Sequence, residues 1–250
     1  MIIVQRNTGS CTEEKEMKHK IIGDNDCPLV EIQLAEDETV RIERGCMAYM
    51  SNVELEGRMN TSKKGIGGMF SAIGRSLTSG ESFFITEATG INDQGRIGIA
   101  PAVPGKICCL QVDDLHQYRL NTGAFLACDS SVQYVMKRQD IGKAFFGGTG
   151  GLFVMETQGD GDLLISCFGD IITLDVDYDS PVTIDNEHVI AWDASLDYSI
   201  HVASGTFGFK SGEGLVNEFT GRGKVLIQTR NIHNMADALR PFFPSSSSNS

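Results

Sequence analysis

The chain has 250 residues, of which 41% are hydrophobic, and its 33 acidic and 21 basic residues give a net charge of −12. Such an acidic chain lacks the positive charge on which nonspecific nucleic-acid binding depends, so the composition disfavours nucleic acid as a partner. No apolar run approaches the roughly 18 residues that would span a bilayer. The start, Met1-Ile-Ile-Val4, is followed at once by Arg6 and Asn7, so no secretory signal is predicted.

The seven cysteines form no Cys-x-x-Cys pair, and several lie in apolar, strand-like runs such as Ile107-Cys-Cys-Leu110. An odd number of buried thiols fits a reducing compartment better than a disulfide framework or a zinc site. We therefore expect free cysteines, a cytoplasmic protein, and no metal or other cofactor.

In chain order, residues 1–16 carry no repeated pattern and are expected to form an appendage. A single folded body is predicted over residues 17–243, and the serine-rich residues 244–250 are predicted to be a disordered tail. Apolar and polar residues alternate in Val30-Glu-Ile-Gln-Leu34 and Val53-Glu-Leu-Glu56. This is the period of half-buried β-strands.

One short pattern occurs three times: a glycine, an apolar strand, a turn, and a second apolar strand. Its copies cover residues 80–99, 150–165 and 212–227. We predict that each copy is a β-hairpin. Because one small hairpin cannot bury its own apolar face, the copies are expected to pool their faces in a common body.

A second element also recurs: one copy precedes the first hairpin, and one follows each of the first two hairpins. The last hairpin has no such element after it, so we predict that it completes the first repeat and closes the chain on itself. The repeats are then residues 27–60 with 211–231, residues 79–137, and residues 149–203. The predicted fold class is all-β: three repeated β-sandwich or double-stranded β-helix units with pseudo-threefold symmetry.

Apolar residues recur at helical spacing between Ile232 and Leu239, just before Pro241. This spacing predicts a short C-terminal helix that ends at the proline. We expect the helix to dock Phe242 and Phe243 onto the β-body.

Motifs that carry chemistry are weak. The five histidines include no His-x-His pair, although His188 and His201 flank the same repeat and could approach each other. A metal enzyme of the β-helix type needs clustered imidazoles and a carboxylate, so we predict no metal site and no catalytic residues. The glycine runs at residues 65–68 and 147–151 lack the lysine and hydroxyl of a phosphate loop, and we interpret them as linkers.

Basic and aromatic residues recur in the three segments between the repeats. These residues could pack on a neighbouring unit or subunit, or contact a partner protein or an anionic membrane surface. The candidates are Lys63, Lys64, Met69, Phe70, Ile73, Phe145, Phe146, Phe207 and Phe209.

Two pairs of carboxylates occupy matching positions in the repeats: Glu81 with Glu213, and Asp129 with Asp193. Paired carboxylates can perform acid–base chemistry. Repeat symmetry places these residues in separate units, however, so we expect them to accept hydrogen bonds from turn amides instead.

Several motifs in a fixed order resemble a known family. They are Met17-Lys-His-Lys-Ile21, Gly45-Cys-Met-Ala-Tyr-Met-Ser51, Gly123-Ala-Phe-Leu-Ala-Cys-Asp129, Gly212-Glu-Gly-Leu215 and Val225-Leu-Ile-Gln-Thr-Arg-Asn231. The set is similar to the bacterial relatives of the altered-inheritance-of-mitochondria protein twenty-four family, over about residues 17–243. The resemblance implies a fold like that of the tryptophan RNA-binding attenuation protein, with three units in a chain and three chains in a ring. It implies no established enzymatic activity and no accepted ligand.

We therefore predict a non-enzymatic, ring-shaped homotrimer that acts as a scaffold or binding protein. Two alternatives stay open: an RNA-binding ring, by analogy with the attenuation protein, and a small-molecule or metal-dependent enzyme of the β-helix type. A basic rim lined with aromatic residues would favour RNA or a membrane. A polar pocket with convergent histidines and acids would favour an enzyme.

Overall fold

The computed structural model describes residues 17–23, 26–59, 84–138, 153–202 and 214–243. These residues confirm the all-β class: they form nineteen strands, one α-helix and three short 3-10 turns, η1 (Thr122–Ala124), η3 (Asn186–His188) and η5 (Arg240–Phe242). No helix among them is long and apolar enough to cross a membrane.

The strands form three units, and each unit contains two sets of three antiparallel strands. Unit 1 contains β2 (Leu29–Leu34), β7 (Gly95–Ile99) and β4 (Met47–Ser51) in one set, and β5 (Val53–Met59), β6 (Phe84–Gly90) and β3 (Thr39–Glu43) in the other. Unit 2 contains β8 (Ile107–Val112), β13 (Gly161–Ser166) and β10 (Phe125–Asp129), then β11 (Gln133–Arg138), β12 (Phe153–Gln158) and β9 (Tyr118–Asn121). Unit 3 contains β14 (Ile171–Val176), β19 (Gly223–Gln228) and β16 (Val189–Asp193), then β17 (Asp197–Val202), β18 (Leu215–Thr220) and β15 (Val182–Asp185). The order of strand pairing is therefore the same in all three units, while their pseudo-threefold symmetry stays a prediction.

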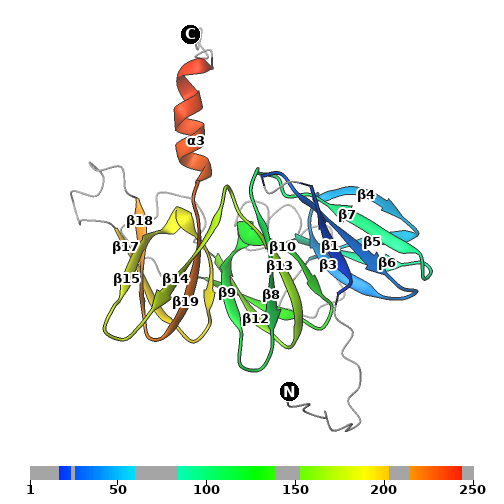
Figure 1. The fold of residues 1–250 in the computed structure, drawn as a ribbon, viewed down its shortest axis with the longest axis horizontal. Helices are drawn as coiled ribbons and strands as arrows, with labels where there is room; N and C mark the ends of the chain where they lie inside the picture. The colour runs from blue at the N-terminus through cyan, green and yellow to red at the C-terminus, as the bar shows by residue number, and fades with distance from the viewer. Residues whose placement is uncertain (1–16, 24–25, 60–83, 139–152, 203–213, 244–250) are drawn as a thin grey trace, which may run out of the picture.

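Neighbouring units are joined by strand pairing. At the first joint β3 pairs with β10, and Arg41 lies opposite Cys128. At the second joint β9 pairs with β16, and Arg119 lies opposite Trp192. The joints create two continuous six-stranded sheets, so the units form a row with unit 1 (blue) and unit 3 (yellow to orange) at opposite ends (Figure 1).

The joints also merge the hydrophobic cores of adjacent units. Leu126 and Ala127 of β10 belong to the core of unit 1, whereas Phe125 and Cys128 of the same strand belong to the core of unit 2. All four side chains are at most 1% exposed. β10 therefore buries one face in its own unit and the other face in the preceding unit, and β16 does the same between units 3 and 2.

The predicted closure of the chain is wrong. Strands β18 and β19, within residues 211–231, pair with the strands of unit 3 and not with residues 27–60. Unit 1 is completed by β6 and β7, so the boundaries predicted for the repeats are all displaced by one strand pair. Each strand pair joins the element directly before it, which keeps the connections short, as sequential elements of a fold usually do.

The predicted hairpins are also wrong, although their strands are present. β6 and β7 enter different sheets, and so do β12 and β13, and β18 and β19. The turns between them include Gly159 and Gly221, whose φ angles of +93° and +110° favour glycine. Because the two strands lie in different sheets, Ala88 of β6 and Ile97 of β7 reach one core from two sheets.

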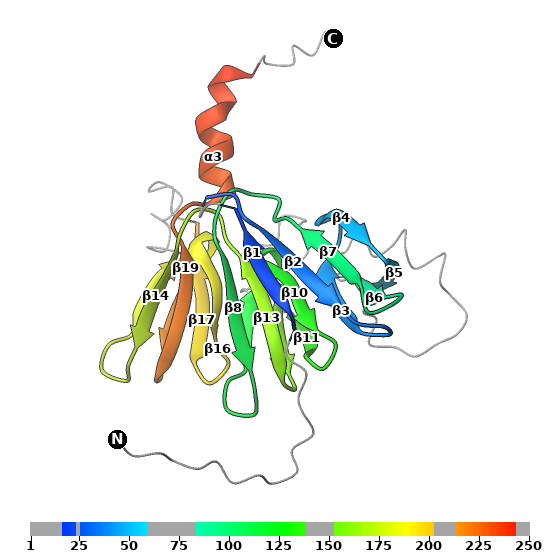
Figure 2. The same ribbon diagram turned by 45° about the vertical axis from the view of Figure 1, so that its right-hand side comes forward.

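The C-terminal helix α3 (Ile232–Leu239) forms as predicted and is capped by the side chain of Asn231. Its predicted docking is wrong. The helix projects away from the β-body (Figures 1 and 2), and Phe242 and Phe243 are 83% and 67% exposed. The helical spacing of the apolar residues correctly predicts an apolar face on α3, but no described surface covers that face.

Because α3 buries none of its residues, deletion of residues 232–250 should leave the β-body intact. Surface changes usually alter the free energy of unfolding by less than about 0.5 kcal/mol, which here corresponds to a midpoint change of roughly 2 °C or less. Circular dichroism during heating would measure this midpoint. A much larger decrease would show that the helix packs on the body.

Candidate functional site

Most of the candidate residues from the sequence lie outside the described residues. They are Lys63, Lys64, Met69, Phe70, Ile73, Phe145, Phe146, Phe207, Phe209, Glu81 and Glu213. The contact role of the nine basic, aromatic and apolar residues stays a prediction, and so does the hydrogen bonding expected of Glu81 and Glu213.

Asp129 and Asp193 each accept a hydrogen bond from a backbone amide, but the donors lie at the start of strands β13 and β19 and not in turns. Asp129 Oδ2 accepts the backbone N–H of Asp162 at 2.7 Å, and Asp193 Oδ2 accepts that of Lys224 at 2.8 Å. A Cβ atom at Gly161 would lie 2.8 Å from Asp129 Oδ2, so only glycine permits this close approach. The two aspartates therefore tie β10 to β13 and β16 to β19.

His188 and His201, the two histidines that flank one repeat, lie in different settings. The His188 ring bonds the Gln228 carbonyl through Nδ1 at 2.6 Å, and its Nε2 lies 3.2 Å from the Asn231 amide nitrogen. Both ring nitrogens are therefore used to support the chain just before α3. His201 is exposed on β17.

A polar cluster that the motifs of the sequence did not predict joins units 1 and 2, and we call it the His19 cluster. It consists of His19, Cys109 and Asp162, whose ligand-capable atoms all lie within 4.8 Å of one another. His19 Nδ1 lies 3.6 Å from Asp162 Oδ2. Asp162 is 3% exposed, and its other carboxylate oxygen accepts a hydrogen bond from the Gln111 side chain.

Three strands position the His19 cluster. Asp162 of β13 lies directly opposite Gln111 of β8, and Cys109 is two residues before Gln111, so all three side chains share one face of the sheet. His19 comes from β1 (His19–Ile22), which pairs with β2 in unit 1. β1 has no counterpart among the described strands of units 2 and 3, and it lies against the sheet of β8 and β13 (Figure 2).

Burial changes the acidity of the groups around the His19 cluster. Desolvation raises the pKa of Asp129 to about 6, with a further increase from the Asp162 carboxylate and an opposing effect of the Asp162 amide. Desolvation and the negative charge of Asp162 raise the pKa of the Cys109 thiol to about 12. Without a bound cation, the thiol is therefore protonated at neutral pH.

The His19 cluster is particular to unit 2. The counterparts of Asp162 are Arg96 in unit 1 and Lys224 in unit 3, each the residue after the glycine that starts the strand. The counterparts of Cys109 are Glu31 and Thr173. An acid where the other copies carry a base was a signal in the sequence, but His19 lies outside the repeats and could not be linked to it.

The row of units ends in two strand edges that no described residue pairs with. β4 is the counterpart of β10 and β16, because each pairs with the last strand of its unit and shows the same register shift. Met50 of β4 is 44% exposed, whereas its counterparts Cys128 and Trp192 are 1% exposed. At the other end β15, the counterpart of β3 and β9, pairs only with β18.

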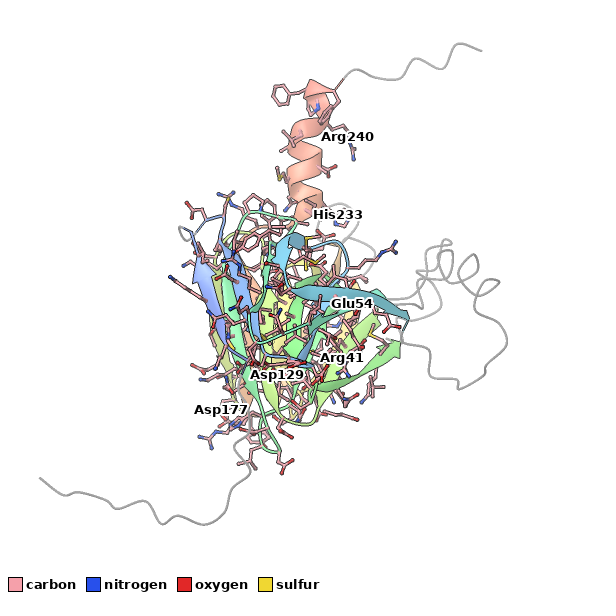
Figure 3. All side chains as sticks on the ribbon, turned by 90° about the vertical axis from the view of Figure 1, so that its right-hand side faces the viewer. Arg41, Glu54, Asp129, Asp177, His233 and Arg240 are labelled. Atoms are coloured by element: carbon pink, nitrogen blue, oxygen red, sulfur yellow. The ribbon has the colours of Figure 1, made fainter. Side chains whose placement is uncertain are left out.

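Arginine side chains support both internal joints. Arg41 donates to the carbonyls of Ser130 and Val132 at 3.0 and 2.9 Å, in the turn after β10. Arg119 donates to the carbonyl of Leu196 at 3.0 Å, in the turn after β16. Figure 3 shows Arg41 near Asp129, at the first joint, far from the projecting helix.

Thiol chemistry should separate buried from exposed cysteines. Burial raises the pKa of both Cys46 and Cys128 to about 12, whereas Cys27 is exposed. Because the thiolate is the reactive form, iodoacetamide at pH 8 should modify Cys27 in the folded protein and spare Cys46 and Cys128 until unfolding. Peptide mass mapping would measure this, and rapid modification of Cys128 in the native state would contradict it.

Comparisons with known proteins agree on one family. The profile described as "Mitochondrial biogenesis AIM24" matches residues 19–230. An uncharacterised protein of Streptococcus pyogenes serotype M6 is 45% identical over 249 residues, 98% of each chain. The crystal structure of a Streptococcus pyogenes protein, 43% identical, superposes with a TM-score of 0.75 and covers 91% of this chain and all of that one. The chain therefore belongs to the AIM24 family.

Proposed function

We propose that the protein is a non-enzymatic scaffold or binding protein that works as a homotrimeric ring in the cytoplasm. The observation that carries the proposal is the pair of open edges, β4 and β15. They are the counterparts of the strands that pair with each other at both internal joints. β15 of one subunit can therefore pair with β4 of the next, as a third joint of the same kind.

The internal joints define the register of this third joint. At both internal joints, the arginine of β3 or β9 lies opposite the residue just before the aspartate that ends β10 or β16. The counterparts of these two positions are Thr183 in β15 and Met50 in β4. We therefore expect Thr183 to lie opposite Met50 of the next subunit, and Ile184 opposite Tyr49.

Physical reasoning favours closure over an open assembly. Met47, Tyr49 and Met50 leave a row of large apolar side chains at 37–44% exposure on an edge strand, which invites further strand pairing. Contacts between unlike surfaces produce either a closed ring or an open filament. A ring leaves neither edge exposed, and the family resemblance supports three subunits.

The proposed partner surface follows from the connections between strands. The segments 60–83, 139–152 and 203–213 join β5 to β6, β11 to β12 and β17 to β18. Each segment therefore occupies the same place in the chain path of its unit, and each carries aromatic residues with a basic residue in or beside it. In a ring these segments would recur at corresponding places, where we propose contact with a partner protein or an anionic membrane. The cytoplasmic location is supported by the six described cysteines, all of which are free.

Native mass tests the assembly. Light scattering is expected to give three chains of 27.2 kDa each for the unmodified protein. Met50→Lys places a charge at the proposed joint and should yield monomers. Val135→Lys is the matched control, because Val135 on β11 is 41% exposed but lies outside the joint.

The two variants separate the outcomes, provided that circular dichroism shows both to be folded. A trimeric Val135→Lys protein beside a monomeric Met50→Lys protein would support the ring. A monomeric unmodified protein would refute it, and so would a Met50→Lys protein that remains trimeric.

A further inference from the structure

The geometry points to a divalent transition-metal site at the His19 cluster, with His19, Cys109 and Asp162 as ligands and zinc as the best match. This proposal does not depend on the ring. Imidazole, thiolate and carboxylate are the three side-chain groups that bind zinc in proteins, and a site with three such ligands keeps one position for water. The His19 side chain is 20% exposed, so an ion has access from solvent.

The distances are close to those of a bound ion. Zinc bonds to nitrogen and oxygen of about 2.0–2.2 Å place two tetrahedral ligand atoms roughly 3.3–3.5 Å apart. His19 Nδ1 and Asp162 Oδ2 are 3.6 Å apart, slightly longer than a hydrogen bond. With all three donors within 4.8 Å of one another, small side-chain movements would complete the site.

The surroundings hold the carboxylate ligand in place. Gln111 donates to the Asp162 oxygen that does not face His19, and the Asp162 backbone N–H is bound by Asp129. Outer partners of this kind fix the orientation of metal ligands and typically change metal affinity by 10–100-fold. Asp162 is therefore presented to His19 and Cys109 and cannot turn freely to solvent.

Charge also favours a cation here. Asp162 and Asp129 are 3% and 9% exposed, and the Asp129 carboxylate accepts a hydrogen bond from the Asp162 backbone N–H. Buried charges in proteins are normally paired or coordinate a metal. The positions that correspond to Asp162 in units 1 and 3 carry Arg96 and Lys224, which would repel a cation, so the site is not repeated there.

Coordination must overcome two competing interactions. The Met17 carbonyl lies 3.0 Å from His19 Nδ1, so an ion must displace this contact or bind Nε2. The Cys109 thiol must lose its proton, which passes to solvent as the sulfur–metal bond forms; the metal keeps its oxidation state. The competing arrangement without metal is the direct approach of His19 Nδ1 to Asp162 Oδ2 at 3.6 Å.

Cobalt(II) provides a direct probe. The full chain, stripped with a chelator, would be titrated with Co²⁺ while its absorption is recorded. A near-ultraviolet thiolate-to-cobalt band is expected for the unmodified protein and should disappear in Cys109→Ser. Cys108→Ser is the matched control: Cys108 is the adjacent half-buried thiol, is not in the cluster, and its replacement should leave the band unchanged.

Two further variants test the other ligands. His19→Gln and Asp162→Asn should each weaken cobalt binding at least tenfold. Zinc should raise the thermal unfolding midpoint of the unmodified protein and of Cys108→Ser but not of Cys109→Ser, because an ion that binds only the folded state stabilises it. Circular dichroism would check that each variant is folded.

Either of two results would overturn the site. One is that the unmodified protein shows neither a thiolate–cobalt band nor an increase of the thermal unfolding midpoint with zinc. The His19–Asp162 interaction alone would then explain why these side chains lie close together. The other is a band that persists in Cys109→Ser, which would place the metal at another cysteine.

Discussion

The backbone pairing of β3 with β10, repeated between β9 and β16, is the interaction on which the rest of the structure depends. Because successive side chains of a strand point to opposite faces, an inner strand at a joint must satisfy two cores at once. β10 does so with Leu126 on one side and Phe125 on the other. β4, the counterpart of β10 in unit 1, has no preceding unit and leaves Met47, Tyr49 and Met50 exposed, and the proposed assembly follows from that deficit.

Much of the strand content could be predicted from the sequence, but its pairing could not. Alternation from Val30 to Leu34 located β2, and the run after Gly223 located β19. The periodicity of apolar residues indicates which face of a strand is buried, but it does not indicate which strand lies beside it. The sequence therefore predicts a hairpin of β6 and β7, although the two strands lie in different sheets. For the same reason the stripe on α3 indicated an apolar face but not what covers it.

Some of the polar interactions could likewise be predicted from the sequence, and others could not. Asp129 and Asp193 could be assigned because the repeat shows them twice in one local setting, each beside a glycine-started strand. His19, Cys109 and Asp162 are far apart in the chain and belong to no motif. Their meeting depends on β1, a strand outside the repeats, packing against unit 2, and such a tertiary contact has no local sequence pattern. If an ion binds there, it would tie β1 to the neighbouring unit across the first joint.

A register-specific cross-link tests the central claim, strand pairing between subunits, most directly. β4 and β15 lie at opposite ends of the row (Figure 1), so cysteines replacing Met50 and Thr183 are too far apart to join within one chain. Between subunits they would be opposite residues with Cβ atoms about 4.5–5.5 Å apart, close to the reach of a disulfide. Mild oxidation is predicted to link the chains covalently into trimers, while a control with cysteines replacing Met47 and Thr183 stays unlinked. Equal linking of both pairs, or none in either folded protein, would contradict the account.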